Sequence, residues 1–166
     1  MVELVTERLV LRGFLPQDAE PMARKISDWD VIKWLTSPPW PYTRADAERF
    51  IGDHMSDDAF AITRDDELLG VVGGDDDLGY WLGQKHWGHG YMTEAAKAFL
   101  AHRFSRRSDP ITSGFVLGNQ ASCNVLTKLG FQNTFVRNDM SVPMKKEVAL
   151  QRMELTADQW RACNAP

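Results

Sequence analysis

The sequence contains little that would suit a metal centre, a disulfide framework or a membrane span. Its 166 residues include two cysteines, Cys123 and Cys163, which form neither a metal-ligand spacing nor a disulfide pattern. No apolar run approaches the length of a membrane-spanning helix. The first residues, 1–8, resemble neither a signal peptide nor a transit peptide. These absences favour a cytoplasmic protein with no metal site and no membrane association.

Basic residues are fewer than acidic ones. Lysine and arginine together number 19 against 23 aspartates and glutamates, so the net charge is −4. A dedicated nucleic-acid-binding protein normally carries a basic patch, so this balance argues against nucleic acid as a partner. Mild acidity suits a cationic or amine partner. The length and the 43% hydrophobic content predict one globular domain over residues 1–166, and leave a monomer and a homodimer equally open.

Two common phosphate-binding motifs are also missing. A P-loop has a glycine, four further residues and then Gly-Lys-Ser/Thr, and this chain has no such run. The dinucleotide fingerprint needs a third glycine where Thr93 stands. What is present is Gly88-His89-Gly90, between an aromatic strand-like run and a helical pattern. The first N–H groups of a helix attract anions, and glycines let phosphate oxygens approach the backbone. The junction indicates a pyrophosphate site, with a purely steric glycine turn as the alternative.

Hydrophobic periodicity divides the rest of the chain into strands and helices. After the glycines, one helix face would carry Met92, Ala95, Ala96, Phe99, Leu100 and Phe104. Strands are indicated over residues 8–14, 59–63, 68–73, 78–82, 111–117, 131–138 and 147–155. Further helical stretches are indicated from Pro16, over 31–35, from Thr43, over 120–129 and from Thr156. The order β-α-α-β-β-β-α-β-α-β-β predicts a layered α/β domain.

Cap residues mark several of these boundaries. Thr43 and Asn119 are predicted to cap the N-termini of two helices, and Gly130 to end the second in a left-handed conformation. In the helix after Thr43, one face would carry Ala47, Phe50, Ile51 and Met55.

Four segments together resemble a known superfamily. They are Thr-Glu-Arg-Leu-Val-Leu-Arg at 6–12, Gly-Tyr-Trp-Leu at 79–82 with Trp-Gly-His-Gly-Tyr-Met-Thr-Glu-Ala at 87–95, the run 119–131, and Leu-Thr-x-x-x-Trp at 155–160. In this order they resemble the GNAT superfamily, and within it the branch containing ribosomal-protein-alanine N-acetyltransferases. The resemblance covers nearly the whole chain. It implies a mixed, mostly antiparallel sheet of about seven strands that splays between the fourth and fifth.

The resemblance also implies ligands and their sites. Acetyl-CoA would donate its acetyl group to a primary amine, on a protein N-terminus or a small molecule, by direct attack on the thioester. A free N–H near Leu82 would stabilise the oxyanion. Lys85 stands where the coenzyme A loop usually has Gln or Arg. The implied cofactor-binding residues are Trp81, Leu82, Gly83, Lys85, Trp87, Gly88, His89, Gly90, Tyr91, Met92, Thr93, Asn119, Ser122 and Asn124.

The proton transfers suggest further candidates. Many superfamily members use a tyrosine at the position of Leu126 to assist the leaving thiolate; its absence here makes Ser122 the candidate. Asp77, in the acidic turn 75–77, is the candidate base, with a solvated surface turn as its alternative. The acceptor amine would be bound by Trp40, Tyr42 and Asp75.

Two other functions fit the same residues. One is a non-catalytic module that binds or senses acyl-CoA, which Leu126 slightly favours. The other is a nucleotide-binding domain that uses the glycine loop for a different phosphate ligand.

Overall fold

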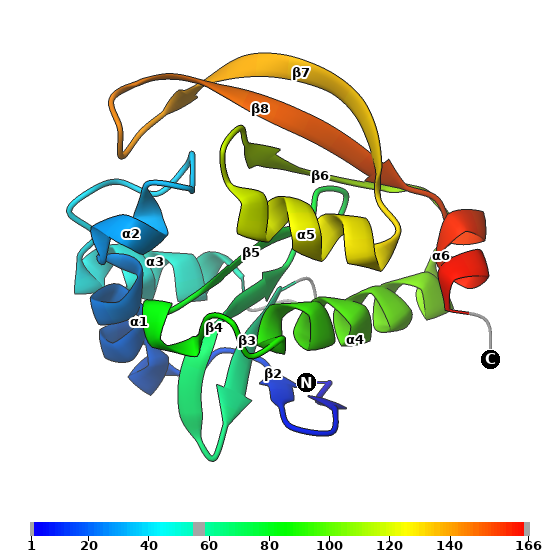
Figure 1. Ribbon diagram of the computed structural model, residues 1–166. Helices are drawn as coiled ribbons and strands as arrows, with labels where there is room; N and C mark the ends of the chain where they lie inside the picture. The colour runs from blue at the N-terminus through cyan, green and yellow to red at the C-terminus, as the bar shows by residue number, and fades with distance from the viewer. Residues whose placement is uncertain (1, 55–58, 165–166) are drawn as a thin grey trace.

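The computed structural model describes residues 2–54 and 59–164, and it confirms the predicted layered α/β fold (Figure 1). The order of helices and strands follows the prediction closely. In chain order the elements are β1 (Leu4–Val5), β2 (Val10–Arg12), the 3-10 helix η1 (Pro16–Asp18), α1 (Ala19–Ile26), α2 (Trp29–Ile32), α3 (Arg44–Asp53), β3 (Ala59–Arg64), β4 (Glu67–Gly73), β5 (Gly79–Leu82), the 3-10 helix η2 (Gln84–His86), α4 (Tyr91–Arg106), β6 (Ile111–Val116), α5 (Gln120–Leu129), β7 (Gln132–Ser141), β8 (Lys146–Leu155) and α6 (Ala157–Cys163).

The strands form two antiparallel sheets that meet at one point. Five strands run in the order β1-β2-β3-β4-β5, and three in the order β6-β8-β7. In the described part of the chain, the only backbone pairing between the two sheets is a parallel bridge between Asp77, just before β5, and Thr112 of β6. The Ser113 hydroxyl of β6 also donates to the Leu78 carbonyl at 2.8 Å. Beyond that bridge the two strands diverge, which confirms the predicted splay. The two-residue strand β1 is an addition to the roughly seven strands expected.

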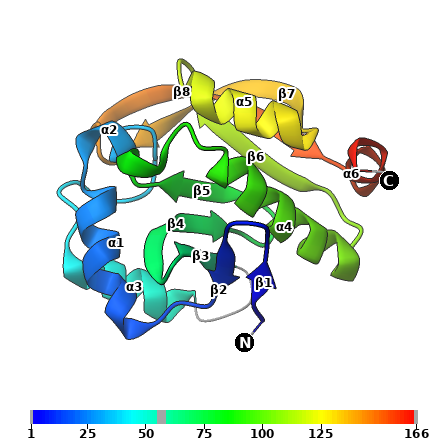
Figure 2. The ribbon, with the colours of Figure 1, turned by 60° about the horizontal axis from the view of Figure 1, so that its bottom comes forward.

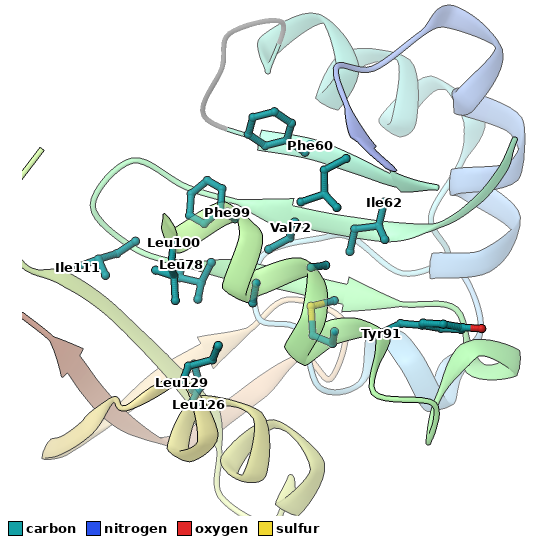
Figure 3. Packing of buried hydrophobic residues seen from close by; sticks show 14 of the residues in the cluster. Phe60, Ile62, Val72, Leu78, Tyr91, Phe99, Leu100, Ile111, Leu126 and Leu129 are labelled. Atoms are coloured by element: carbon teal, nitrogen blue, oxygen red, sulfur yellow. The ribbon is translucent and has the colours of Figure 1, made fainter. Parts of the chain in front are cut away.

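Helices cover both faces of the five-stranded sheet (Figure 2). On one face lies α4, whose predicted apolar side is buried except for the partly exposed Phe104. Figure 3 shows Phe99 and Leu100 of α4 lying between Phe60 of the sheet and Leu126 of α5. On the other face, α1 and α3 bury a second cluster that includes Ala47 and Ile51 as expected; Met55 lies outside the described residues. No helix within 2–54 or 59–164 combines the length and apolarity needed to cross a bilayer.

The predicted caps are present. The Thr43 side chain accepts the N–H of Asp46 at 3.2 Å, and that of Asn119 accepts the N–H of Ser122 at the same distance. Gly130 ends α5 with φ 97°. The first strand, expected over residues 8–14, is shorter than predicted. It is reduced to β2, because the Arg12 guanidinium turns to pair with Asp18 at 2.7 Å as the chain enters η1.

The β7–β8 hairpin is longer than predicted and reaches the other half of the molecule. Its strands pair continuously out to Ser141 and Lys146, so the hairpin arches over the opening (Figure 1). At its tip the N–H of Val142 donates to the carbonyl of Thr36 at 2.9 Å. This contact closes one side of the space between the two sheets.

Candidate active site

A cleft of about 940 Å³ follows the opening between β5 and β6. It brings together most of the residues that the sequence singled out. Those lining it are Trp81, Leu82, Trp87, Gly88, Gly90, Tyr91, Met92, Thr93, Asn119, Ser122, Asn124, Asp77 and Tyr42. Five others do not line it: Gly83, Lys85, His89, Trp40 and Asp75.

The free edge of β5 faces this cleft. The N–H of Gly83 donates to the Leu69 carbonyl of β4 at 2.9 Å, and the β4–β5 register has no shift. Because hydrogen bonding alternates along an antiparallel pair, Trp81 also faces β4, while the peptide groups of Tyr80 and Leu82 face the opening. The Leu82 carbonyl accepts the indole N–H of Trp87 at 2.9 Å. The N–H of Leu82 is therefore directed at the cleft.

The edge of β6 completes the opening from the other side. The N–H of Leu117 donates to Ala149 of β8 at 2.9 Å, so by the same alternation Gly114 and Val116 face β5. At the closed end, the N–H of Leu78 donates to the Thr112 carbonyl at 2.8 Å. Two strand edges thus diverge from a pinned end and form a slot that an extended ligand can enter as an added strand.

The glycine loop lies where β5 leads into α4. Gly88 and Gly90 have φ of 77° and 78°, in the left-handed region where side chains are rarely accommodated. A Cβ at Gly88 would meet open space, so the backbone conformation and not crowding requires glycine there. The N–H of Glu94 is the first to bond within the helix, to Gly90 at 3.1 Å. The N–H groups that precede it at the start of α4 have no intrahelical carbonyl to bond, and such groups attract anions.

The first segment of the chain holds this loop in place. Glu94 accepts hydrogen bonds from the Thr6 hydroxyl at 2.6 Å and from the Arg8 side chain at 2.7 Å, and Arg8 also donates to the His89 carbonyl at 2.9 Å. Burial alone would raise the pKa of Glu94, but the hydrogen bonds from Thr6 and Arg8 outweigh it and lower that pKa. Thr6 and Arg8 belong to the opening motif, yet no sequence spacing indicates a partner more than 80 residues away.

Ser122 contacts a residue that the sequence did not single out. Its hydroxyl lies 2.7 Å from the hydroxyl of Tyr80, which projects from β5 into the same cleft. Burial raises the pKa of Tyr80, although the hydrogen bond with Ser122 partly opposes this. Because side chains alternate along β5, the sequence could have placed Tyr80 on the face toward α4 and α5. Its contact with Ser122 depends on how α5 packs, which the sequence pattern does not reveal.

The acidic turn 75–77 is engaged in ion pairs. Asp75 is exposed and pairs with Arg107 near the end of α4, away from the cleft. Asp77 lines the cleft, and its Oδ1 accepts from the Thr112 hydroxyl at 2.8 Å and from Arg152 at 2.5 Å. Of the two carboxylates predicted to act at the site, the geometry brings Asp77 to it and leaves Asp75 outside.

The aromatic residues before α3 are arranged differently from the expectation. Trp40 is 42% exposed and outside the cleft, where its indole N–H donates to the Ser27 carbonyl at 3.2 Å. Its ring packs edge-on against Trp29. Trp34 is partly buried and lines the cleft. Tyr42 is buried at the cleft, where burial and then the charge of Asp46 raise its pKa to about 12.

An open strand edge that leads to a helix N-terminus is an arrangement that can hold a long phosphorylated carrier beside a second substrate. The model of the acetyltransferase (GNAT) domain matches residues 8–132, more than half of the chain. The chain therefore belongs to the GNAT family and is an N-acetyltransferase.

Individual relatives agree with this assignment. N-acetyltransferase p20 of Bacillus licheniformis is 28% identical over 155 residues, 84% of this chain and 87% of the relative. A GNAT acetyltransferase of Bacillus anthracis is 22% identical with a TM-score of 0.81, covering 95% of this chain and 99% of its own. RimL, a ribosomal L7/L12 alpha-N-protein acetyltransferase solved with coenzyme A, is 18% identical with a TM-score of 0.80 and the same coverage. At these identities the two structures show the shared fold.

Glu94→Gln tests whether the N-terminal segment orders the glycine loop. The change leaves Arg8 without its charged partner, so we expect the Kd for coenzyme A to rise about three- to tenfold. Titration calorimetry with coenzyme A measures this. Glu7→Gln makes the same chemical change in an exposed neighbour of Arg8 and serves as the control. Equal Kd values for the two variants would contradict the role of Glu94.

Proposed function

We propose that this acetyltransferase moves the acetyl group of acetyl-CoA to a primary amine by direct attack of the neutral amine on the thioester. The acceptor is the amine of a protein N-terminus or of a small molecule. The observation that carries the proposal is the slot between β5 and β6, which ends at the glycine loop. The pantetheine arm can pair with a strand edge there while the pyrophosphate occupies the start of α4.

The same geometry can stabilise the negative charge that develops on the thioester oxygen in the transition state. The N–H of Leu82 is directed at the slot, while the indole of Trp87 engages the carbonyl of the same residue. An N–H in that position can donate to the thioester oxygen as it gains negative charge. Loss of a comparable donor costs about 2.7–4 kcal/mol of transition-state stabilisation. The coenzyme A complex of the structurally similar RimL supports acetyl-CoA as the donor.

Departure of the thiolate requires a second stabilising group. Ser122 lines the cleft at the start of α5, one turn before Leu126, where many family members carry a tyrosine. Its hydroxyl is a weak acid, so its role is to donate a hydrogen bond to the sulfur. A hydrogen bond to a charged group contributes about 1.5–3 kcal/mol.

Ser122→Ala removes that hydrogen bond and leaves the α5 backbone in place. We expect kcat to fall about ten- to hundredfold, because the interaction develops only as the thiolate leaves. The KM for acetyl-CoA should change little. Steady-state thiol release from acetyl-CoA gives both constants. Thr127→Val on the exposed side of α5 is the control, and a matching loss in kcat and in affinity for acetyl-CoA would argue against this role.

Asp77 is the proposed acceptor-side carboxylate. An ammonium must lose a proton before it attacks, and a carboxylate lining the cleft can attract it and receive the proton directly or through water. Its bonds to Arg152 and Thr112 hold the carboxylate in one orientation.

Asp77→Asn keeps an oxygen that can accept from Thr112 and removes the negative charge. We expect kcat/KM for the amine to fall about tenfold or more at neutral pH, with a smaller loss at alkaline pH where the amine is already neutral. Asp76→Asn changes an exposed carboxylate of the same turn and is the control. A loss that does not vary with pH would exclude the proton-accepting role.

Thiol release from acetyl-CoA, measured across polyamines, amino acids, aminoglycosides and N-terminal peptides, tests the function itself. Turnover with at least one amine is expected. RimL acts on a protein N-terminus. Peptides with a free N-terminal alanine or serine are therefore the first to try. Coenzyme A binding without turnover on any amine would favour the acyl-CoA-sensing module. Thermal stabilisation by ATP or NAD in place of coenzyme A would favour the nucleotide-binding alternative.

A further inference from the structure

Tyr80 and Ser122 meet across the slot from different parts of the chain. Tyr80 projects from the free-edge strand β5, and Ser122 lies in the first turn of α5, 42 residues later. Their hydroxyl oxygens are 2.7 Å apart, an ordinary distance for an O–H···O hydrogen bond. Both residues are partly buried and both line the cleft. The pair therefore lies beside the cleft, and Tyr80 also packs against the core that α4 and α5 bury.

Only one of the two hydroxyls can donate in this hydrogen bond. The N–H of Ser122 is already bonded to the side chain of Asn119 at 3.2 Å, which fixes the start of the helix and the position of the serine Cβ. If Ser122 donates to Tyr80, its proton points away from the ligand. If Tyr80 donates, the Ser122 proton is free to point at the sulfur. Burial raises the pKa of Tyr80, so the phenol keeps its proton and can act as the donor.

We propose that Tyr80 is a positioning residue for acetyl transfer, which donates its hydroxyl proton to Ser122 Oγ and so orients the Ser122 O–H at the leaving sulfur. The inference rests on the proposed function of the slot. Two hydrogen bonds in series polarise each other and strengthen the one that reaches the sulfur.

The reaction balances without any loss of the Tyr80 proton. The amine nitrogen forms the new C–N bond, the C–S bond breaks, and its electron pair goes to sulfur. The proton lost by the amine passes to Asp77 or to water. The thiolate accepts the hydrogen bond from Ser122 and equilibrates with protons of the solvent after release. A thiolate, whose conjugate acid has a pKa of about 8.5, is too weak a base to deprotonate a phenol of higher pKa.

Tyr80→Phe removes the hydroxyl and keeps the ring. With the best amine from the panel, we expect kcat to fall about tenfold while the KM for acetyl-CoA stays within about twofold. The double variant Tyr80→Phe/Ser122→Ala should lose no more than Ser122→Ala alone, because the tyrosine acts only through the serine. Replacement of Tyr80 by 4-aminophenylalanine, which restores an N–H donor on the same ring, should recover much of the loss. Thermal unfolding checks that each variant is folded.

The possible results distinguish a positioning role of Tyr80 from a mere packing contact. They also distinguish failure of this inference from failure of the proposed function. A Tyr80→Phe variant with the kcat of the original protein, or with a raised KM and unchanged kcat, would overturn the proposal, as would additive losses in the double variant. An original protein that releases no thiol with any amine would overturn the proposed function and this inference together. Turnover by the original protein, together with an unchanged kcat in Tyr80→Phe, would overturn this inference alone.

Discussion

The structure depends on one hydrogen-bonded junction, where Leu78 and Thr112 hold β5 and β6 together. The N–H of Leu78 donates to Thr112, and the N–H of Thr112 donates back to Asp76. Within the described residues, β5 and β6 pair nowhere else. Adjacent strands that twist apart from a single pinned point must leave peptide groups exposed along both edges. In this protein the cleft follows those edges.

Every element of the site is positioned relative to that junction. The glycine loop follows β5 directly, so its position along the slot is set by the length of one strand. α5 follows β6, which places Ser122 opposite β5. Buried Arg103 reinforces the closed end, because its guanidinium donates to the Asp75 carbonyl at 2.9 Å and to the Asp109 carbonyl at 3.0 Å. A shift of either strand at the junction would therefore separate the N–H of Leu82 from Ser122.

The N-terminal segment connects this frame to the glycine loop. Thr6 and Arg8 come before β2, at the opposite edge of the five-stranded sheet from β5, yet their side chains reach Glu94 in the first turn of α4. This helix crosses one face of the sheet, so its N-terminus lies close to the start of the chain (Figure 2). The opening motif and the glycine loop are in this way parts of one structural unit.

Local patterns determined the helices, the strands and their caps. The faces of α4 and α5, the Asn119 cap and the left-handed Gly130 follow from side-chain periodicity and from backbone preferences within a few residues. The four motifs, in order, were enough to indicate the GNAT family. Tertiary packing decided what spacing along the sequence does not encode. It placed Trp34 at the cleft and left Trp40 outside. It also paired Asp75 with Arg107, Glu94 with Arg8, and Tyr80 with Ser122. The last three contacts join residues that are 32 to 86 positions apart, and their partners are set by how β5, β6 and the helices pack.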